Sequence, residues 1–388
     1  MFTMDPLTFT GMPRGTDQPI TVDLPAPRVQ LQAIPDPRKR RGVRYPLAVL
    51  APHSVASQVH HSADWAHERA AEPAQVFGLS RTRMPHPTTW RRVLGFGVAA
   101  AAIDTAVAPL LQPVPSPAVA PRASPQVAPD GKTIPARTGQ GVQPVSAYRV
   151  TRQVTLQQVA VPRKANELTV APILLTGLPL AGVIVTGDAM SARRDLSIQL
   201  VEAGGDSCWI VKENQKPLYD DLRPLFGPQP EALPGTNPLP DDVLTVRTVE
   251  RTHGRWDERV ITTSSLLADD QGWPYLAQAF QVVRTTERSR RCAREVRYGI
   301  TSAPATALPA GDVLTVVRRH RQIENGLHYR RDATPDEDAS PVRRGAAPQV
   351  VARPSNLVGA LAARAGVTNL TARQRALAAT VDRWLFRP

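Results

Sequence analysis

Cysteine, aromatic residues and long apolar runs are all scarce in this 388-residue chain. Its two cysteines, Cys208 and Cys292, cannot build a disulfide framework, and they lack the nearby Cys or His partners of a structural zinc site. The longest apolar run, residues 93–103, is about half a membrane span, and the N-terminus lacks the pattern of a signal peptide. We therefore expect a soluble, cytoplasmic protein with no membrane partner.

Several common enzyme motifs are also missing, and acidic residues are outnumbered. The sequence has no Walker A pattern, no GxSxG elbow and no complete GxGxxG, so we expect no nucleotide cofactor. Lys and Arg number 47 against 34 Asp and Glu, which gives a formal net charge of +13. This excess favours a polyanionic partner, and nucleic acid is the first candidate.

Proline divides the chain into segments. The 39 prolines are about twice the average usage. We expect a mobile tail at 1–35, a small helical domain at 36–112, and a polyproline-like linker at 113–129. The predicted remainder is an α/β unit at 130–222, a proline-rich connector with a β-rich insertion at 223–302, and final helices with a tail at 303–388.

Hydrophobic periodicity predicts the elements of an α/β fold. Strands are expected at 144–150, 154–161, 181–188 and 208–211, and helices at 166–178, 192–203, 215–222, 311–331 and 356–365. Between 243 and 302, apolar and charged residues alternate, which is typical of an antiparallel sheet with one wet face. We expect this sheet to form a layer separate from the core.

Three acidic residues stand out by their context. Asp130 follows a short run that could form a strand, Asp188 ends the most apolar strand, and Glu324 lies within a helix among cations. Two carboxylates about 4 Å apart repel by about 4 kcal/mol at an effective dielectric of 20, so such a cluster requires cations. Ligands that are all oxygen favour Mg²⁺ or Mn²⁺ over zinc.

Each of these acids has a structural alternative. Asp130 could be a turn aspartate, Asp188 could cap the following helix, and Glu324 could pair with a cation at helical spacing. The run 336–338, Asp-Glu-Asp, is the rival for the third position.

Basic residues gather in two places. The block 36–46 contains Arg38, Lys39, Arg40, Arg41 and Arg44, which suit phosphate contact, although a solvated turn has the same composition. The predicted β-rich insertion contains Arg284, Arg288, Arg290, Arg291, Arg294 and Arg297. This second set could line a DNA groove or form a solvated face, and we favour DNA.

Successive sequence blocks carry a family resemblance. They are VAPDGKT, NELTVAPILLTGLPLAGVIVTGDAM, VEAGGDSCWIVKENQKPLYDDL, HGRWDER, YGITS and HRQIENGLHYRRDATPDEDAS, preceded by DPRKRRGVRYPLAVL and HPTTWRRVLG. In this order the blocks resemble those of DDE transposases from bacterial insertion sequences, of the ISAs type that includes the H-repeat-associated proteins.

The resemblance implies an RNase H-like catalytic core with a β-rich insertion, preceded by a small helical DNA-binding domain. It implies that Asp130, Asp188 and Glu324 hold two Mg²⁺ or Mn²⁺ ions for phosphodiester cleavage and strand transfer. Lys132, in the matching DGKT block, and Arg331 are expected to contact DNA. His320 and His328 share a helix face with Glu324 and could help to orient DNA, although they could equally be surface histidines. The implied partners are double-stranded DNA, as terminal inverted repeats and target, and a second copy in a homodimer on nucleoid DNA.

Two alternative functions stay open. Ser191 and Arg321 stand where the family commonly has His and Trp, and the stretch 134–144 lacks the family's usual arginine-glycine turn. A degraded transposase remnant that binds DNA without cutting it would show such departures. The other alternative is a related nuclease without strand transfer.

Overall fold

The structure is a computed structural model that divides into two compact units. It describes residues 8–11, 20–23, 34, 36, 43, 86, 89, 92–93, 98–99, 102–106, 125–131, 144–151, 154–161, 167–227, 242–252, 254–268, 272–288, 291–321, 350, 353, 356–357 and 359–360. None of the described helices is long and apolar enough to cross a bilayer.

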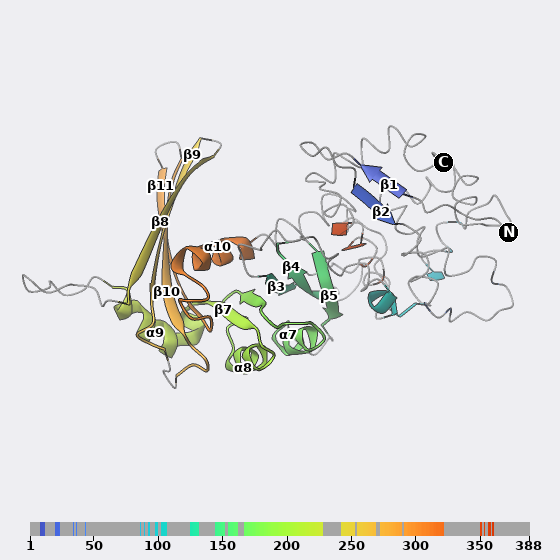
Figure 1. Cartoon of the computed structure of the whole chain (residues 1–388), viewed down its shortest axis with the longest axis horizontal. Helices are drawn as coiled ribbons and strands as arrows, with labels where there is room; N and C mark the ends of the chain where they lie inside the picture. Colours follow the sequence, from blue (N-terminus) through green and yellow to red (C-terminus); the bar gives the residue numbers. More distant parts are fainter. Residues whose placement is uncertain are drawn as a thin grey trace, which may run out of the picture. The chain divides into compact units, whose positions relative to one another are not determined.

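A mixed sheet forms the centre of the unit that contains residues 119–130 and 165–323. Its strands lie in the order β3 (Gln126–Gly131), β6 (Ile184–Gly187), β7 (Asp206–Val211), β11 (Arg291–Thr301), β10 (Gln278–Arg288), β9 (Arg255–Ser264) and β8 (Leu244–Thr252) (Figure 1). Strands β3, β6 and β7 are parallel, whereas every later pair is antiparallel. The predicted α/β class is confirmed.

The four long strands of the insertion are confirmed, but the prediction that they form a separate layer is wrong. The end of β11, from Tyr298 to Thr301, pairs with Cys208–Val211 of β7, so the insertion continues the core sheet. Gly299 makes this close approach possible, because a Cβ there would lie 2.2 Å from the Phe280 ring and 2.5 Å from the Trp209 carbonyl oxygen. Strands β8–β11 extend from the core as an arm (Figure 1).

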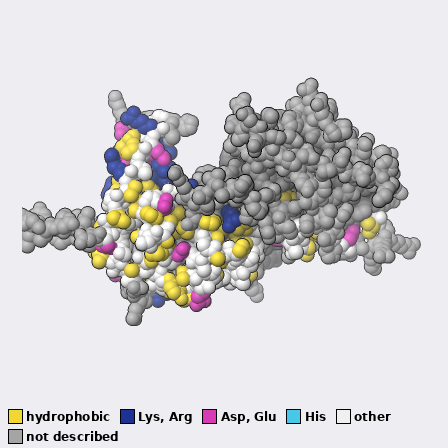
Figure 2. Space-filling view, in the orientation of Figure 1, with side chains coloured by type: hydrophobic (Ala, Val, Ile, Leu, Met, Phe, Trp, Pro, Cys, Tyr) yellow, Lys and Arg dark blue, Asp and Glu magenta, His cyan; other side chains and the backbone are white. Residues whose placement is uncertain are grey.

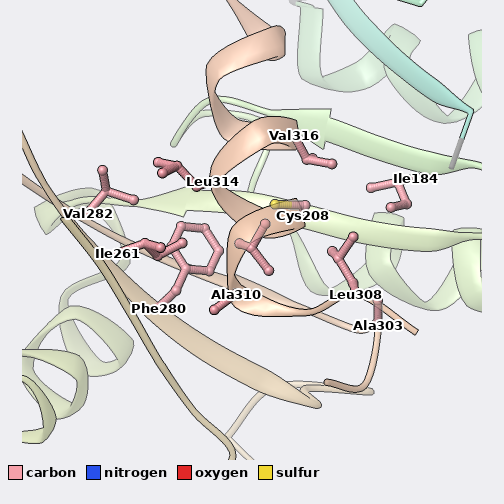
Figure 3. Packing of buried hydrophobic residues seen from close by; sticks show 11 residues of the cluster. Ile184, Cys208, Ile261, Phe280, Val282, Ala303, Leu308, Ala310, Leu314 and Val316 are labelled. Carbon is pink, nitrogen blue, oxygen red and sulfur yellow. The ribbon is translucent and has the colours of Figure 1, made fainter. Parts of the chain in front are cut away.

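Helix α10 (Ala310–His320) packs on one face of the sheet. Its side chains meet strand side chains in one apolar cluster: Ile184, Cys208, Ile261, Phe280, Val282, Ala303, Leu308, Ala310, Val313, Leu314 and Val316 (Figure 3). The cluster joins residues of core strands β6 and β7 to residues of arm strands β9 and β10. Helix α10 therefore covers both the core and the base of the arm.

The opposite face of the sheet carries α7 (Glu167–Thr176) and α8 (Arg194–Glu202) (Figure 1). Side chains alternate along β7, so Cys208 enters the α10 cluster while Trp209 points to α8. The Trp209 Nε1 donates a 2.8 Å hydrogen bond to Ser197 Oγ of α8. Helix α9 (Lys216–Leu225) follows a 3-10 turn (Glu213–Gln215) and packs against β11.

Some boundaries differ from the sequence-based prediction, and one hairpin was not predicted. Strand β3 begins at Gln126, inside the predicted linker, because Gln126 and Val127 pair with β6 and are buried. Helix α9 continues to Leu225, into the predicted connector. In the segment 1–35, where no element was predicted, β1 (Thr8–Gly11) pairs antiparallel with β2 (Ile20–Asp23). Strands of four residues are too short to produce a clear period.

The second unit contains the predicted hairpin of β4 (Pro144–Arg149) and β5 (Val154–Ala160), which pair antiparallel. The Arg353 side chain, 4% exposed, donates to Asp104 at 2.9 to 3.2 Å and to the Gln158 carbonyl at 3.2 Å. Burial raises the pKa of Asp104, and Arg353 opposes this. Residues 102–106 are helical, but most of the predicted 36–112 domain lies outside the described residues.

Candidate active site

Two of the predicted carboxylates lie at the carboxyl ends of neighbouring parallel strands. Asp130 is the penultimate residue of β3, and Asp188 directly follows β6. The register pairs Gln126 with Ile184 and Val127 with Val185, and its continuation sets Asp130 beside Asp188. Facing residues of parallel strands point to the same face. The two side chains therefore share the edge of the sheet where open α/β folds place their sites.

The turn after β6 orients the Asp188 carboxylate. Its Oδ1 accepts hydrogen bonds from the Met190 N–H, the Ser191 N–H and the Ser191 hydroxyl, each at 3.1 Å. Helix α8 begins only at Arg194, so the alternative that Asp188 caps this helix is wrong. Asp188 is exposed, and no donor from the described part of the chain contacts its Oδ2. One carboxylate oxygen is thus left for a ligand.

Gly187 lets this turn lie against β7. A Cβ at this position would be 2.5 Å from Ser191 Cβ and 2.6 Å from Cζ3 of Trp209. Real Cβ atoms do not approach other atoms so closely, so a larger residue would displace the turn that holds Asp188.

A chain of hydrogen bonds on the same face connects the two strands to α10. The Gln126 Nε2 donates to the Val316 carbonyl at 2.9 Å and to Thr186 Oγ1 at 3.1 Å. Thr186 Oγ1 lies 3.0 Å from Nδ1 of His320, the last residue of α10. Gln126 shares a face with Asp130, so this chain lies on the carboxylate side of the sheet. Sequence reasoning selected His320 but missed Gln126 and Thr186.

Electrostatics also connect His320 to the two carboxylates. Burial lowers the pKa of His320, Asp130 and Asp188 raise it, and Arg297 lowers it. The net direction is downward, which favours the neutral imidazole at neutral pH. The ring therefore lies within electrostatic range of both aspartates.

The other predicted site residues lie outside the described residues. They are Glu324, Lys132, His328, Arg331, Arg38, Lys39, Arg40, Arg41 and Arg44, together with the rival run 336–338. Among the residues that the structure does describe, no three His, Cys, Asp or Glu side chains could hold a metal ion together. The two aspartates alone therefore do not make up such a group within the described segments.

Arginines of the insertion divide between the two faces of the arm. Figure 2 shows Lys and Arg side chains along the visible side of the arm. The strand registers place Arg255, Arg259, Arg284, Arg288, Arg291 and Arg297 on the face where α10 packs, and Arg247, Arg251 and Arg294 on the other. Arg294 therefore lies on the face opposite to the other described members of the predicted set. Arg290 lies outside the described residues.

Asp257 of β9 neutralises part of this arginine face. Its side chain is 2% exposed and accepts hydrogen bonds from Arg284 at 2.7 and 3.1 Å and from Thr286 at 2.9 Å. Arg255 pairs with the same carboxylate at 2.8 Å. The Arg284 hydrogen bond is the main cause that lowers the pKa of Asp257 to about 2. These cross-strand partners depend on register, so no local sequence signal identifies them.

A second acidic residue of this face ties the arm to α10. Glu250 of β8 pairs with Arg259 of β9 at 3.2 Å and with Arg318 of α10 at 2.5 Å. The Arg318 hydrogen bond is the main cause that lowers the pKa of Glu250. Arg321, which follows α10, lies 3.9 Å from Glu295 of β11. Ion pairs therefore hold the end of α10 against two strands of the arm.

Comparison with known proteins identifies the family. The family model described as the transposase DDE domain matches residues 122–340, which include both aspartates and more than half of the chain. The chain therefore belongs to the DDE transposase domain family. The predicted family is confirmed.

Curated relatives agree with this assignment. The chain is 30% identical over 235 residues to the "H repeat-associated putative transposase YhhI" of Escherichia coli K12, a match that covers 57% of this chain and 59% of that protein. It is 26% identical over 345 residues to the "Putative transposase YncI" of Escherichia coli O157:H7, covering 83% of each. This chain thus spans less than two thirds of the length of YhhI and of a second Escherichia coli K12 relative, YbfL, with 59% of each protein covered.

A solved structure also shows a weak likeness. It is the cryo-electron microscopy structure of the piggyBac transposase synaptic complex with hairpin DNA, at 10% identity and a TM-score of 0.41. The match covers 89% of this chain and 74% of that one. The likeness is too weak to transfer any property to this chain.

Proposed function

We propose that the protein is a DNA transposase that cleaves and joins phosphodiester bonds at a site formed by Asp130, Asp188 and Glu324. The observation that carries the proposal is the position of Asp130 beside Asp188 at the ends of two parallel strands, in a chain of the DDE transposase family. Parallel β3, β6 and β7, with helices on both faces, support an RNase H-like core.

The donor set fits Mg²⁺ or Mn²⁺. Carboxylate oxygens are the ligands that these hard ions prefer, and Asp188 Oδ2 accepts no hydrogen bond from the described residues. Two bound ions would activate the attacking oxygen and stabilise the leaving oxygen during in-line phosphoryl transfer. The protein's own contribution is orientation: the 188–191 turn fixes Asp188 through Oδ1 and leaves Oδ2 for the ligand.

The turn also bears on the alternative of a degraded remnant. Ser191 is one of the departures from the family pattern, yet both its N–H and its hydroxyl donate to the Asp188 carboxylate. This departure is therefore compatible with an oriented carboxylate. It supports an active enzyme more than a binding protein.

Charge supports double-stranded DNA as the partner. The net charge is +13, and Arg288 and Arg291 are exposed on the α10 face of the arm, where no described acidic residue pairs with them. Such cations suit phosphate contact. In this proposal the basic block 36–46 and the helical domain 36–112 bind the terminal repeats. A homodimer joins the two DNA ends.

A nicking assay on supercoiled plasmid with Mg²⁺ tests the proposal. Asp188→Asn keeps an oxygen that can accept the turn's hydrogen bonds but loses the anionic ligand, so cleavage should fall by orders of magnitude while DNA binding survives. Asp195→Asn is the matched control, because Asp195 is an exposed carboxylate of α8 that pairs with Arg193. Asp188→Asn protein that nicks like wild type would refute the site. Wild-type protein that binds DNA without nicking would support the remnant.

A further inference from the structure

Hydrogen bonds link Gln126, Thr186 and His320 in a chain whose direction depends on the His320 tautomer, and the buried Gln126 Oε1 has no partner among the described residues. A glutamine amide nitrogen carries two hydrogens, whereas a carbonyl oxygen can only accept. Since Gln126 Nε2 reaches the Val316 carbonyl at 2.9 Å, the orientation of the amide is fixed. Its second hydrogen is donated to Thr186 Oγ1 at 3.1 Å. Thr186 must therefore donate its own single hydrogen elsewhere.

Two acceptors compete for the Thr186 hydrogen. The Val127 carbonyl lies 3.5 Å away, beyond the usual range for a hydroxyl donor, whereas His320 Nδ1 lies 3.0 Å away. Thr186 is buried, so a poorly paired hydroxyl hydrogen would be unfavourable. The shorter contact favours Nδ1 of His320 as the acceptor of the Thr186 hydrogen.

We infer that Gln126 and Thr186 are positioning residues that hold His320 as the Nε2–H tautomer, and that this N–H donates to a DNA phosphate beside Asp130 and Asp188. The phosphate part rests on the proposed function, whereas the tautomer does not. A neutral imidazole whose Nδ1 accepts must carry its hydrogen on Nε2. No acceptor from the described residues contacts Nε2, so this donor is left for a ligand.

The surroundings of the ring agree with this assignment. The charged groups that face His320 are Asp130, Asp188 and Arg297, and burial outweighs the two carboxylates in lowering the pKa of His320. The neutral ring is thus favoured, as the Thr186 hydrogen bond requires. A phosphate oxygen would accept the hydrogen bond from Nε2–H, which none of these three groups accepts.

Nitrogen-15 NMR of the full chain, labelled on histidine ring nitrogens, tests the tautomer. His320→Gln identifies the His320 signals, and the other histidines serve as internal controls. We expect a single Nε2–H form in wild type. Thr186→Val removes the hydroxyl but keeps the shape of the side chain, so this form should no longer be the single one. Thr186→Ser restores the hydroxyl and should restore the single form. An Nδ1–H ring in wild type, or an unchanged spectrum in Thr186→Val, would overturn the inference.

The phosphate contact has a separate test. One hydrogen bond to a charged group is worth about 10- to 100-fold in an equilibrium or rate. We therefore expect Thr186→Ser to nick plasmid at least about tenfold faster than Thr186→Val. Equal rates with the tautomer shift present would overturn the phosphate role and keep the tautomer. Absence of nicking in every variant and in wild type would instead count against the proposed function.

Discussion

Asp257→Asn is expected to loosen the arm without affecting the core strands. The buried Asp257 carboxylate accepts hydrogen bonds from Arg284 and Thr286 and forms an ion pair with Arg255. Asparagine at this position keeps the shape of the side chain but loses its charge. The Arg284 hydrogen bond, with help from Thr286 and nearby arginines, lowers the pKa of Asp257 from 3.8 to about 2. One pKa unit corresponds to about 1.4 kcal/mol, so the ionised carboxylate contributes about 2 kcal/mol to the arm.

The sign of the pH dependence follows from the direction of this shift. A carboxylate whose folded pKa is lowered contributes its full stabilisation above the unfolded pKa of about 4, and that contribution is lost as the pH falls through about 2. The stability difference between wild type and Asp257→Asn should therefore be largest at neutral pH. It should shrink steadily below pH 4.

Hydrogen exchange measured by mass spectrometry resolves the arm from the rest of the chain. At neutral pH, peptides of β9 and β10 should lose roughly 30-fold in protection in Asp257→Asn. Glu287→Gln is the matched control, because Glu287 is an exposed carboxylate of β10. Equal protection in the two variants, or a difference that grows below pH 4, would refute the assignment of Asp257 as the anchor of the arginine face.

Two further predictions concern the site turn and DNA. Gly187→Ala should lower the free energy of unfolding by about 1 to 3 kcal/mol in a urea titration, because its Cβ meets Ser191 and Trp209. Gly311→Ala in α10 places its Cβ 4.0 Å from Val246 Cγ1, an ordinary contact, and should stabilise by about 0.5 to 1 kcal/mol. Equal effects would contradict the packing argument. Alanine substitution of the cations in block 36–46 should flatten the salt dependence of DNA binding, since each lost phosphate contact removes about 0.9 from the slope. An unchanged slope would remove the block from the interface.

Sequence alone located Asp188 because its strand has a strong local signal. The segment 181–188 is an apolar run that ends in a glycine and a carboxylate, and buried parallel strands have this composition. Asp130 lacks such a signal, because β3 contains Pro129 and follows a proline-rich stretch. Only the family blocks selected Asp130 over a turn aspartate.

The polar chain to His320 could not be predicted from local patterns. Its contacts join residues 60, 134 and 190 positions apart, and they depend on the register of β3 against β6 and on where α10 ends. A weak signal did exist, because Gln126 and Thr186 are polar residues within apolar runs. Buried polar groups need partners, so both positions indicated a hydrogen-bond network without identifying its members.

The position of the insertion was missed for a related reason. Alternation showed that β8–β11 form an antiparallel sheet, but it cannot show which edge of that sheet meets another strand. The pairing of β11 with β7 and the packing of α10 across β6, β9 and β10 place the arm and the core in one sheet under one helix. The Arg318–Glu250 pair adds a polar tie between that helix and β8. Close-packed elements transmit displacement, so DNA held by the arm would act on the helix that carries His320 rather than on a freely hinged domain.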